Sequence, residues 1–104
     1  METLSPDDLR QRLARNAATV VDVREAEELA IAHLPDSVHL PLSQMGERWQ
    51  ELKELTNLVL VCHHGMRSER AARFLEKNGF GGLAHLGGGL DAWAVEIDPD
   101  MPRY

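Results

Sequence analysis

The stretch that decides the fold is LVLVCHHGMRS, which runs from Leu58 to Ser68. Its first four residues are apolar and predict a buried strand. Ser68 to Lys77, which follow without a break, have the composition of a helix. Cys62, the only cysteine of the chain, therefore lies in the tight turn that joins the strand to the helix.

This position predicts a reactive sulfur. Backbone N–H groups at the start of a helix have no partner within the helix, so they favour an anion. A thiol placed there loses its proton more easily, and the thiolate is the nucleophilic form. Gly65 leaves room for the loop to bend toward the sulfur, and Arg67 adds a permanent positive charge that suits an oxyanion. We predict that Cys62 is a nucleophile; the alternative is a buried structural cysteine.

Composition sets limits on the whole protein. The 104 residues, 43% hydrophobic and 27% charged, predict one globular domain with its own core. The net charge of −6 argues against a nucleic-acid partner, which calls for a basic surface. A single cysteine forms no internal disulfide, the N-terminus is acidic, and no apolar run approaches the ~18 residues that span a bilayer. We expect a cytoplasmic protein with no membrane contact.

The remaining segments alternate between short apolar strands and helices. Ser5 before Pro6 is typical of a helix N-cap. Further strands are expected at 19–23, 37–40 and 83–86, further helices at 25–32, 45–55 and 90–95, and an irregular tail at 97–102. Such alternation predicts a mostly parallel sheet covered on both faces. Sites in these sheets lie beyond the carboxyl ends of the strands, where Cys62 and the end of the strand at Asp22 converge.

Four segments resemble one protein family. Residues 62–68 resemble the active-site loop of rhodanese-type sulfurtransferases, Cys-x-x-Gly-x-Arg/Thr. VDVRE at 21–25 resembles the first signature of the family, HLP at 33–35 its Gly-His-Ile-Pro element, and GGLDAW at 88–93 its closing Gly-Gly-x-x-x-Trp. The four occur in the family order between Ser5 and Trp93. The departures from the family pattern lie around the HLP segment at 33–35. Ala32 replaces a glycine, Asp36-Ser37 a Gly-Ala pair, and His39 an asparagine.

The resemblance implies a fold and an activity. The fold is a rhodanese-like α/β domain with a central, mostly parallel five-stranded sheet flanked by helices on both faces. One domain spans 1–104, with its core at about 5–95 and an irregular C-terminal tail. Cys62 carries sulfane sulfur as a persulfide, taking it from thiosulfate or a persulfide donor. The acceptor is a thiol, a cyanide-like molecule or a protein sulfur acceptor, and no cofactor or metal is implied.

The resemblance also assigns roles to individual residues. Cys62 is the catalytic residue, and the substrate-binding loop consists of His63, His64, Gly65, Met66, Arg67 and Ser68. Asp22 and Arg24 hold this loop in place; a strand-end turn with surface pairing is the alternative. The span from Cys62 to Arg67 has the length of the sulfur-transfer form, since related phosphatases and arsenate reductases carry one residue more.

Other interpretations stay open at this point. Cys62, His63 and His64 are adjacent, which fits one metal ion poorly, so the two histidines are expected to shape the mouth of the loop. Arg70 either attracts anionic donors or is an ordinary surface residue, whereas Arg73 is expected to pair with Glu69. A non-enzymatic sulfur-relay or interaction module and a cysteine phosphatase are the alternative functions.

Overall fold

The computed structural model describes all 104 residues as alternating strands and helices. The strands are β1 (Glu2–Leu4), β2 (Thr19–Asp22), β3 (Val38–His39), β4 (Leu58–Val61) and β5 (Ala84–Leu86). The helices are α1 (Pro6–Ala14), α2 (Ala26–Ile31), α3 (Leu42–Arg48), the 3₁₀ helix η1 (Trp49–Leu52), α4 (Met66–Lys77) and α5 (Gly89–Glu96). The alternation expected from the sequence is therefore confirmed. None of these helices has the length and apolar character needed to cross a membrane.

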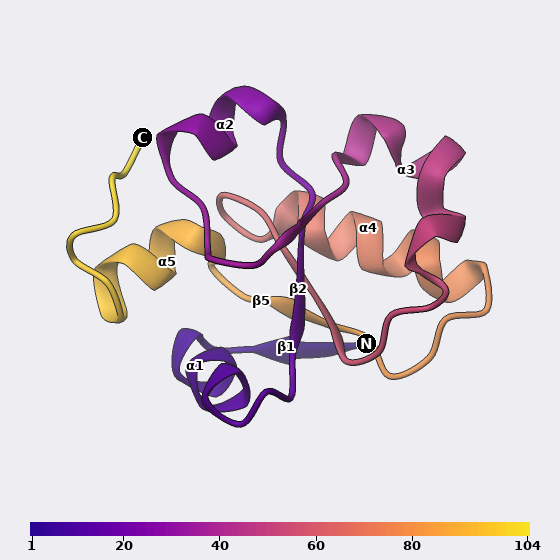
Figure 1. Ribbon diagram of the computed structural model, residues 1–104, viewed down its shortest axis with the longest axis horizontal. Helices are drawn as coiled ribbons and strands as arrows, with labels where there is room; N and C mark the ends of the chain where they lie inside the picture. The colour runs from indigo at the N-terminus through magenta and orange to yellow at the C-terminus, as the bar shows by residue number, and fades with distance from the viewer.

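The five strands form one parallel sheet in the order β1-β5-β4-β2-β3, so the predicted fold class is confirmed (Figure 1). β4 lies at the centre, between β2 and β5. β1 is the strand that periodicity alone did not predict, because its three residues are too few to show a pattern and only Leu4 is buried. It forms by pairing with β5, with Thr3 opposite His85.

Apolar layers cover both faces of the sheet. Leu58 and Leu60 of β4 pack toward α3 and α4, whereas Val59 and Val61 pack toward α1 and α5. All four side chains are buried, which is why the strand is apolar without alternation. Because both faces are filled, the open edge at the carboxyl ends of the strands is the place left for a site.

Local signals in the sequence set several boundaries. Ser5 caps α1 as predicted: its hydroxyl accepts from the Asp8 N–H at 3.1 Å, and its own N–H donates to the Asp8 carboxylate at 3.1 Å. Asp36, which stands where the family usually has glycine, adopts a left-handed φ of 60°. Aspartate tolerates this conformation better than most residues, so it can occupy a turn position that glycine often fills.

Candidate active site

The sulfur of Cys62 lies in a turn whose amides point at it. Cys62 follows β4, and its Sγ accepts hydrogen bonds from the N–H of Gly65 at 3.0 Å and of Ser68 at 3.3 Å. Gly65 stands just before α4 with a φ of 103°, a conformation that favours glycine. Two N–H groups of the turn therefore point at the sulfur, as the sequence predicted, and such an arrangement suits an anion.

Cys62 is reached from a hollow on the surface. The residue is only 1% exposed, yet it lines a hollow of about 240 Å³ together with His63, His64, Met66, Arg67 and Arg70. Met66 and Arg70 are exposed at its rim. The structure thus brings the predicted loop residues together around the sulfur, with Gly65 and Ser68 behind it and the larger side chains around the opening.

The loop is held by the first residues of α5, Gly89–Glu96. The carbonyls of Cys62 and His63 accept hydrogen bonds from the N–H groups of Leu90 at 2.8 Å and Asp91 at 3.0 Å. A Cβ at Gly89 would lie 2.3 Å from the His63 carbonyl oxygen, so only glycine allows this approach. Loop carbonyls therefore face α5 while loop amides face the sulfur, and the closing glycine motif serves as a packing element beside the site.

Asp22 and Arg24 form a buried ion pair beside the loop. Arg24 Nη2 lies 2.7 Å from Asp22 Oδ2, and both side chains are at most 1% exposed, so this is not a surface pair. The guanidinium also donates to the Ala32 carbonyl at 2.7 Å and to Tyr104 Oη at 2.8 Å. Burial acts to lower the pKa of Arg24, but hydrogen bonds to Asp22 and Tyr104 outweigh it and raise the pKa. His39 Nε2 lies 2.7 Å from the Arg24 carbonyl oxygen, which gives this departure from the family pattern a structural use.

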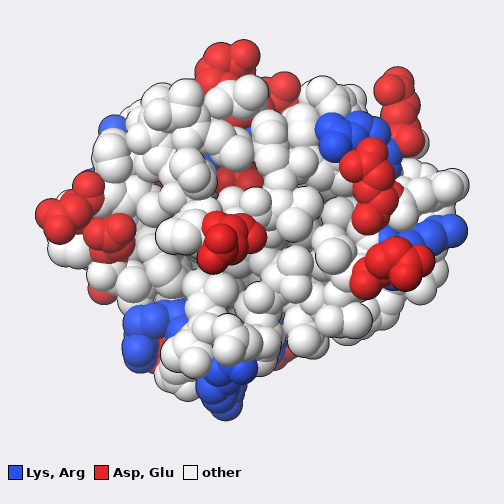
Figure 2. Space-filling model, viewed as in Figure 1, with Lys and Arg blue, Asp and Glu red and all other residues white.

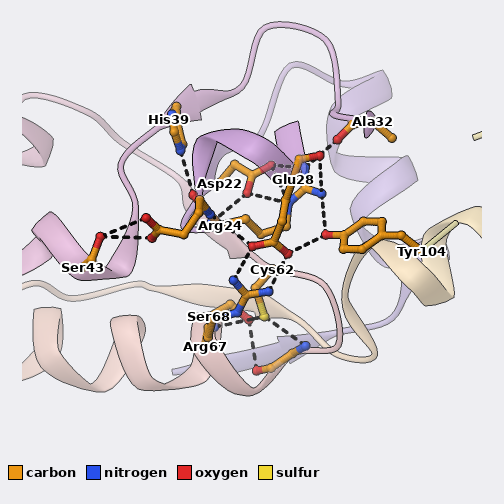
Figure 3. A network of polar contacts seen from close by, with 12 residues as sticks. Asp22, Arg24, Glu28, Ala32, His39, Ser43, Cys62, Arg67, Ser68 and Tyr104 are labelled. Carbon is orange, nitrogen blue, oxygen red and sulfur yellow. Dashed lines mark hydrogen bonds and ion pairs between the residues drawn. The ribbon is translucent and has the colours of Figure 1, made fainter. Parts of the chain in front are cut away.

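Arg67 already has a carboxylate partner, which the sequence did not reveal. Its Nη1 and Nη2 donate to Glu28 Oε1 at 2.6 Å and Oε2 at 2.8 Å, a two-pronged contact (Figure 3). The Arg67 hydrogen bonds lower the pKa of Glu28 to about 2, although burial opposes this shift. Glu28 in turn raises the pKa of Arg67. An oxyanion that binds Arg67 must therefore compete with Glu28.

The C-terminal tail returns to the site through Tyr104. Its hydroxyl donates to Glu28 Oε2 at 2.7 Å, and its ring stacks on that of His63 with centroids 3.9 Å apart. Arg103 pairs with Asp91 at 2.9 Å and anchors the tail on α5. Burial, and then the neighbouring His64, lower the pKa of His63, which favours its neutral ring.

A further histidine, which the sequence did not single out, lies next to Ser68 on the inner side of the sulfur. His85 of β5 is 5% exposed, and its Nδ1 lies 3.2 Å from Ser68 Oγ. Ser68 Oγ in turn lies 3.5 Å from Cys62 Sγ. A histidine inside a short apolar strand was the available signal, but only the pairing of strands places it against Ser68.

Arg70 and Arg73 on α4 have different surroundings. Arg73 pairs with Glu69 at 2.8 Å, as predicted for an exposed helix face. Arg70 forms no ion pair and lies at the rim of the hollow. Acidic groups are scattered over the face shown in Figure 2, several of them beside a basic one, so the charge of −6 does not gather in one patch there.

The family model for the rhodanese-like domain matches residues 5–96. YrkF of Bacillus subtilis (strain 168), whose name describes a candidate sulfur carrier protein, is 42% identical over 79 residues. The match covers 76% of this chain but only 43% of YrkF, so the chain spans less than half of that relative.

Two solved structures are similar over nearly the whole chain. A rhodanese-related protein from Thermoplasma volcanium has a TM-score of 0.84 and 30% identity, covering 98% of this chain and 96% of its own. The human single-domain sulfurtransferase TSTD1 has a TM-score of 0.78 and 25% identity, covering 92% of this chain and 97% of its own. These similarities do not test the roles of single residues, so the roles assigned to the loop, Asp22 and Arg24 stay predictions.

We expect two glycine variants to have opposite effects. Gly89→Ala places a Cβ against the His63 carbonyl at a φ of 64° and should destabilise the protein by about 1–3 kcal/mol. Gly46→Ala, within α3 and with no atom near its Cβ, should stabilise by about 0.5–1 kcal/mol. Urea unfolding measures both changes, and equal stability of the two variants would contradict this account of the loop.

The Glu28–Arg67 pair predicts a pH-dependent contribution to stability. The folded-state pKa of Glu28, about 2, lies below its ordinary value of 4.5. The contribution is therefore present above pH 4.5 and lost as the pH falls toward 2. The difference in unfolding free energy between the wild type and Glu28→Gln, measured with urea across this range, should shrink toward pH 2. Glu27→Gln, an exposed position on the same helix, should show no such trend.

Proposed function

The chain belongs to the rhodanese-like domain family, as its motifs predicted, and on this premise we propose that it transfers sulfane sulfur as a persulfide on Cys62. The observation that carries the proposal is the pair of N–H groups, from Gly65 and Ser68, that point at Sγ. Such groups stabilise an anionic thiolate, and an amide N–H is not itself a nucleophile that competes with the sulfur. The names of YrkF and TSTD1, a sulfur carrier and a sulfurtransferase, support the same activity.

The transfer takes place in two steps. The Cys62 thiolate attacks the outer sulfur of thiosulfate, the S–S bond of the donor breaks, and sulfite leaves with the bonding electron pair. The outer sulfur of the resulting persulfide is then attacked by a thiolate or a cyanide-like acceptor, and the electron pair returns to Cys62. A small persulfide can replace thiosulfate as donor, and a protein thiol can act as acceptor. A single cysteine and this chemistry fit the reducing cytoplasm, which we propose as its location.

The position of Cys62 also allows a sulfur donor to reach it. The hollow opens on the sulfur from the side of Met66 and Arg70, while α5 and the buried Asp22–Arg24 pair lie away from the opening. A donor can therefore approach without displacing the loop. Hydrogen bonds from α5 to the Cys62 and His63 carbonyls hold the start of the loop. The Gly65 and Ser68 amides already point at the sulfur, so they need no reorganisation when its charge distribution changes.

The direct test is the mass of the protein after donor treatment. Wild-type protein incubated with thiosulfate should gain one sulfur atom, and a thiol reductant or cyanide should remove it. Cys62→Ser should gain none under the same conditions. No gain with thiosulfate, a small persulfide or a polysulfide would contradict the proposal. A persulfide that passes to no acceptor would indicate a non-enzymatic interaction or redox module, and Cys62-dependent release of phosphate from an aryl phosphate would indicate a phosphatase.

The role of Arg67 is tested by comparing two donors. Arg67→Ala should raise the KM for thiosulfate about tenfold and change that for a neutral organic trisulfide much less, since only the anion needs the cation. Glu28→Gln, which releases Arg67 from its partner, should lower the KM for thiosulfate. Steady-state kinetics with both donors measures these effects, and an equal loss with both in Arg67→Ala would refute the charge-binding role.

A further inference from the structure

A chain of polar groups leads from the sulfur into the protein, away from the hollow. Ser68 Oγ lies 3.5 Å from Cys62 Sγ, 3.1 Å from the Gly65 carbonyl oxygen and 3.2 Å from His85 Nδ1. The other ring nitrogen, His85 Nε2, lies 3.1 Å from Thr3 Oγ1. Ser68 and His85 are buried, so protein groups rather than bulk water surround both side chains.

The hydrogen-bond partners determine where the protons lie. A carbonyl oxygen only accepts, so the single hydroxyl proton of Ser68 is used on Gly65. His85 Nδ1 must then be the donor to Ser68 Oγ, which makes Nε2 an acceptor. Thr3 agrees with this assignment, because Nε2 is the only protein group to which its hydroxyl is hydrogen-bonded.

The surroundings of His85 favour a neutral ring with one proton. Burial lowers the pKa of His85, whereas Glu69 acts to raise it and Arg73 to lower it. Glu69 and Arg73, both on α4, are the charged groups that face His85, and they pair with each other at 2.8 Å. The neighbouring strands contribute only the Thr3 hydroxyl.

We propose that His85 is a positioning residue that aims the Ser68 hydroxyl at the anionic sulfur of Cys62. With the thiol, S–H donates to Ser68 Oγ and the hydroxyl donates to the Gly65 carbonyl. When the thiol loses its proton, the hydroxyl turns to donate to Sγ, while His85 Nδ1–H keeps the other lone pair occupied. The sulfur then has a third donor beside the N–H groups of Gly65 and Ser68. An Nδ1 without a proton would attract the hydroxyl and leave the sulfur without this donor.

This inference rests on the proposed function for its biological meaning, but its test does not require sulfur transfer. The readout is the rate of Cys62 alkylation by iodoacetamide as a function of pH, which follows the thiolate. Ser68→Ala and His85→Phe should each move the midpoint of this profile upward by about one pH unit, and so slow alkylation about tenfold below the midpoint. His85→Asn, whose amide N–H can replace Nδ1–H, should restore most of the rate. His33→Phe, an exposed histidine outside the network, should leave the profile unchanged.

The double variant separates positioning from a general structural effect. If His85 acts through Ser68, Ser68→Ala with His85→Phe should give the same midpoint as Ser68→Ala alone. Additive shifts, or an unchanged profile in His85→Phe, would overturn the proposal. Nitrogen-15 spectra of the wild-type imidazole provide a check that needs no folded variant: a neutral ring protonated at Nδ1 is expected, and one protonated at Nε2 overturns it. A failed persulfide test with an intact alkylation result would reject only the proposed function.

Discussion

The structure depends on the way in which β4 ends. Both faces of this strand are covered by apolar side chains, so packing on two sides holds it at the centre of the sheet. Its last residue is followed by a turn in which Gly65, at positive φ, directs its own N–H and that of Ser68 toward one atom. Amides that would otherwise lack partners at a helix start thereby find one in Cys62 Sγ. The same contacts complete the turn and place two N–H donors on the sulfur.

Around this turn the protein builds two separate polar supports. On the side of α2, the Asp22–Arg24 pair, Glu28 and Tyr104 connect the end of β2 to Arg67 and to the C-terminal tail. Removing one partner of a buried ion pair such as Asp22–Arg24 lowers the free energy of unfolding by about 3–5 kcal/mol, because the other charge is left buried without a partner. The second support, Ser68 with His85, lies behind the sulfur. The first support holds the guanidinium of Arg67 at the opening of the site. The second orients the hydroxyl of Ser68 in the interior.

Contacts with the site hold Tyr104, the last residue of the C-terminal tail, in a defined position. Residues after α5 form no further helix or strand, yet Tyr104 hydrogen-bonds to Arg24 and Glu28 and stacks on His63. The ring shields His63, whose Nε2 is buried without a hydrogen-bond partner, and this burial favours the neutral imidazole. The mouth of the site therefore combines two histidines, one of them covered by Tyr104, with the cations Arg67 and Arg70.

The sequence by itself determined the strand-turn-helix unit around Cys62 and the cap at Ser5, because these depend on residues close together in the chain. It also predicted the parallel arrangement, because strands and helices alternate along the chain. It could not reveal β1, whose three residues become a strand only against β5. Nor could it predict the contacts of Glu28 with Arg67 or of His85 with Ser68, which join residues 39 and 17 positions apart. Local patterns carry periodicity and capping, whereas the partner of a charge or of a buried imidazole is chosen by how the strands and helices pack.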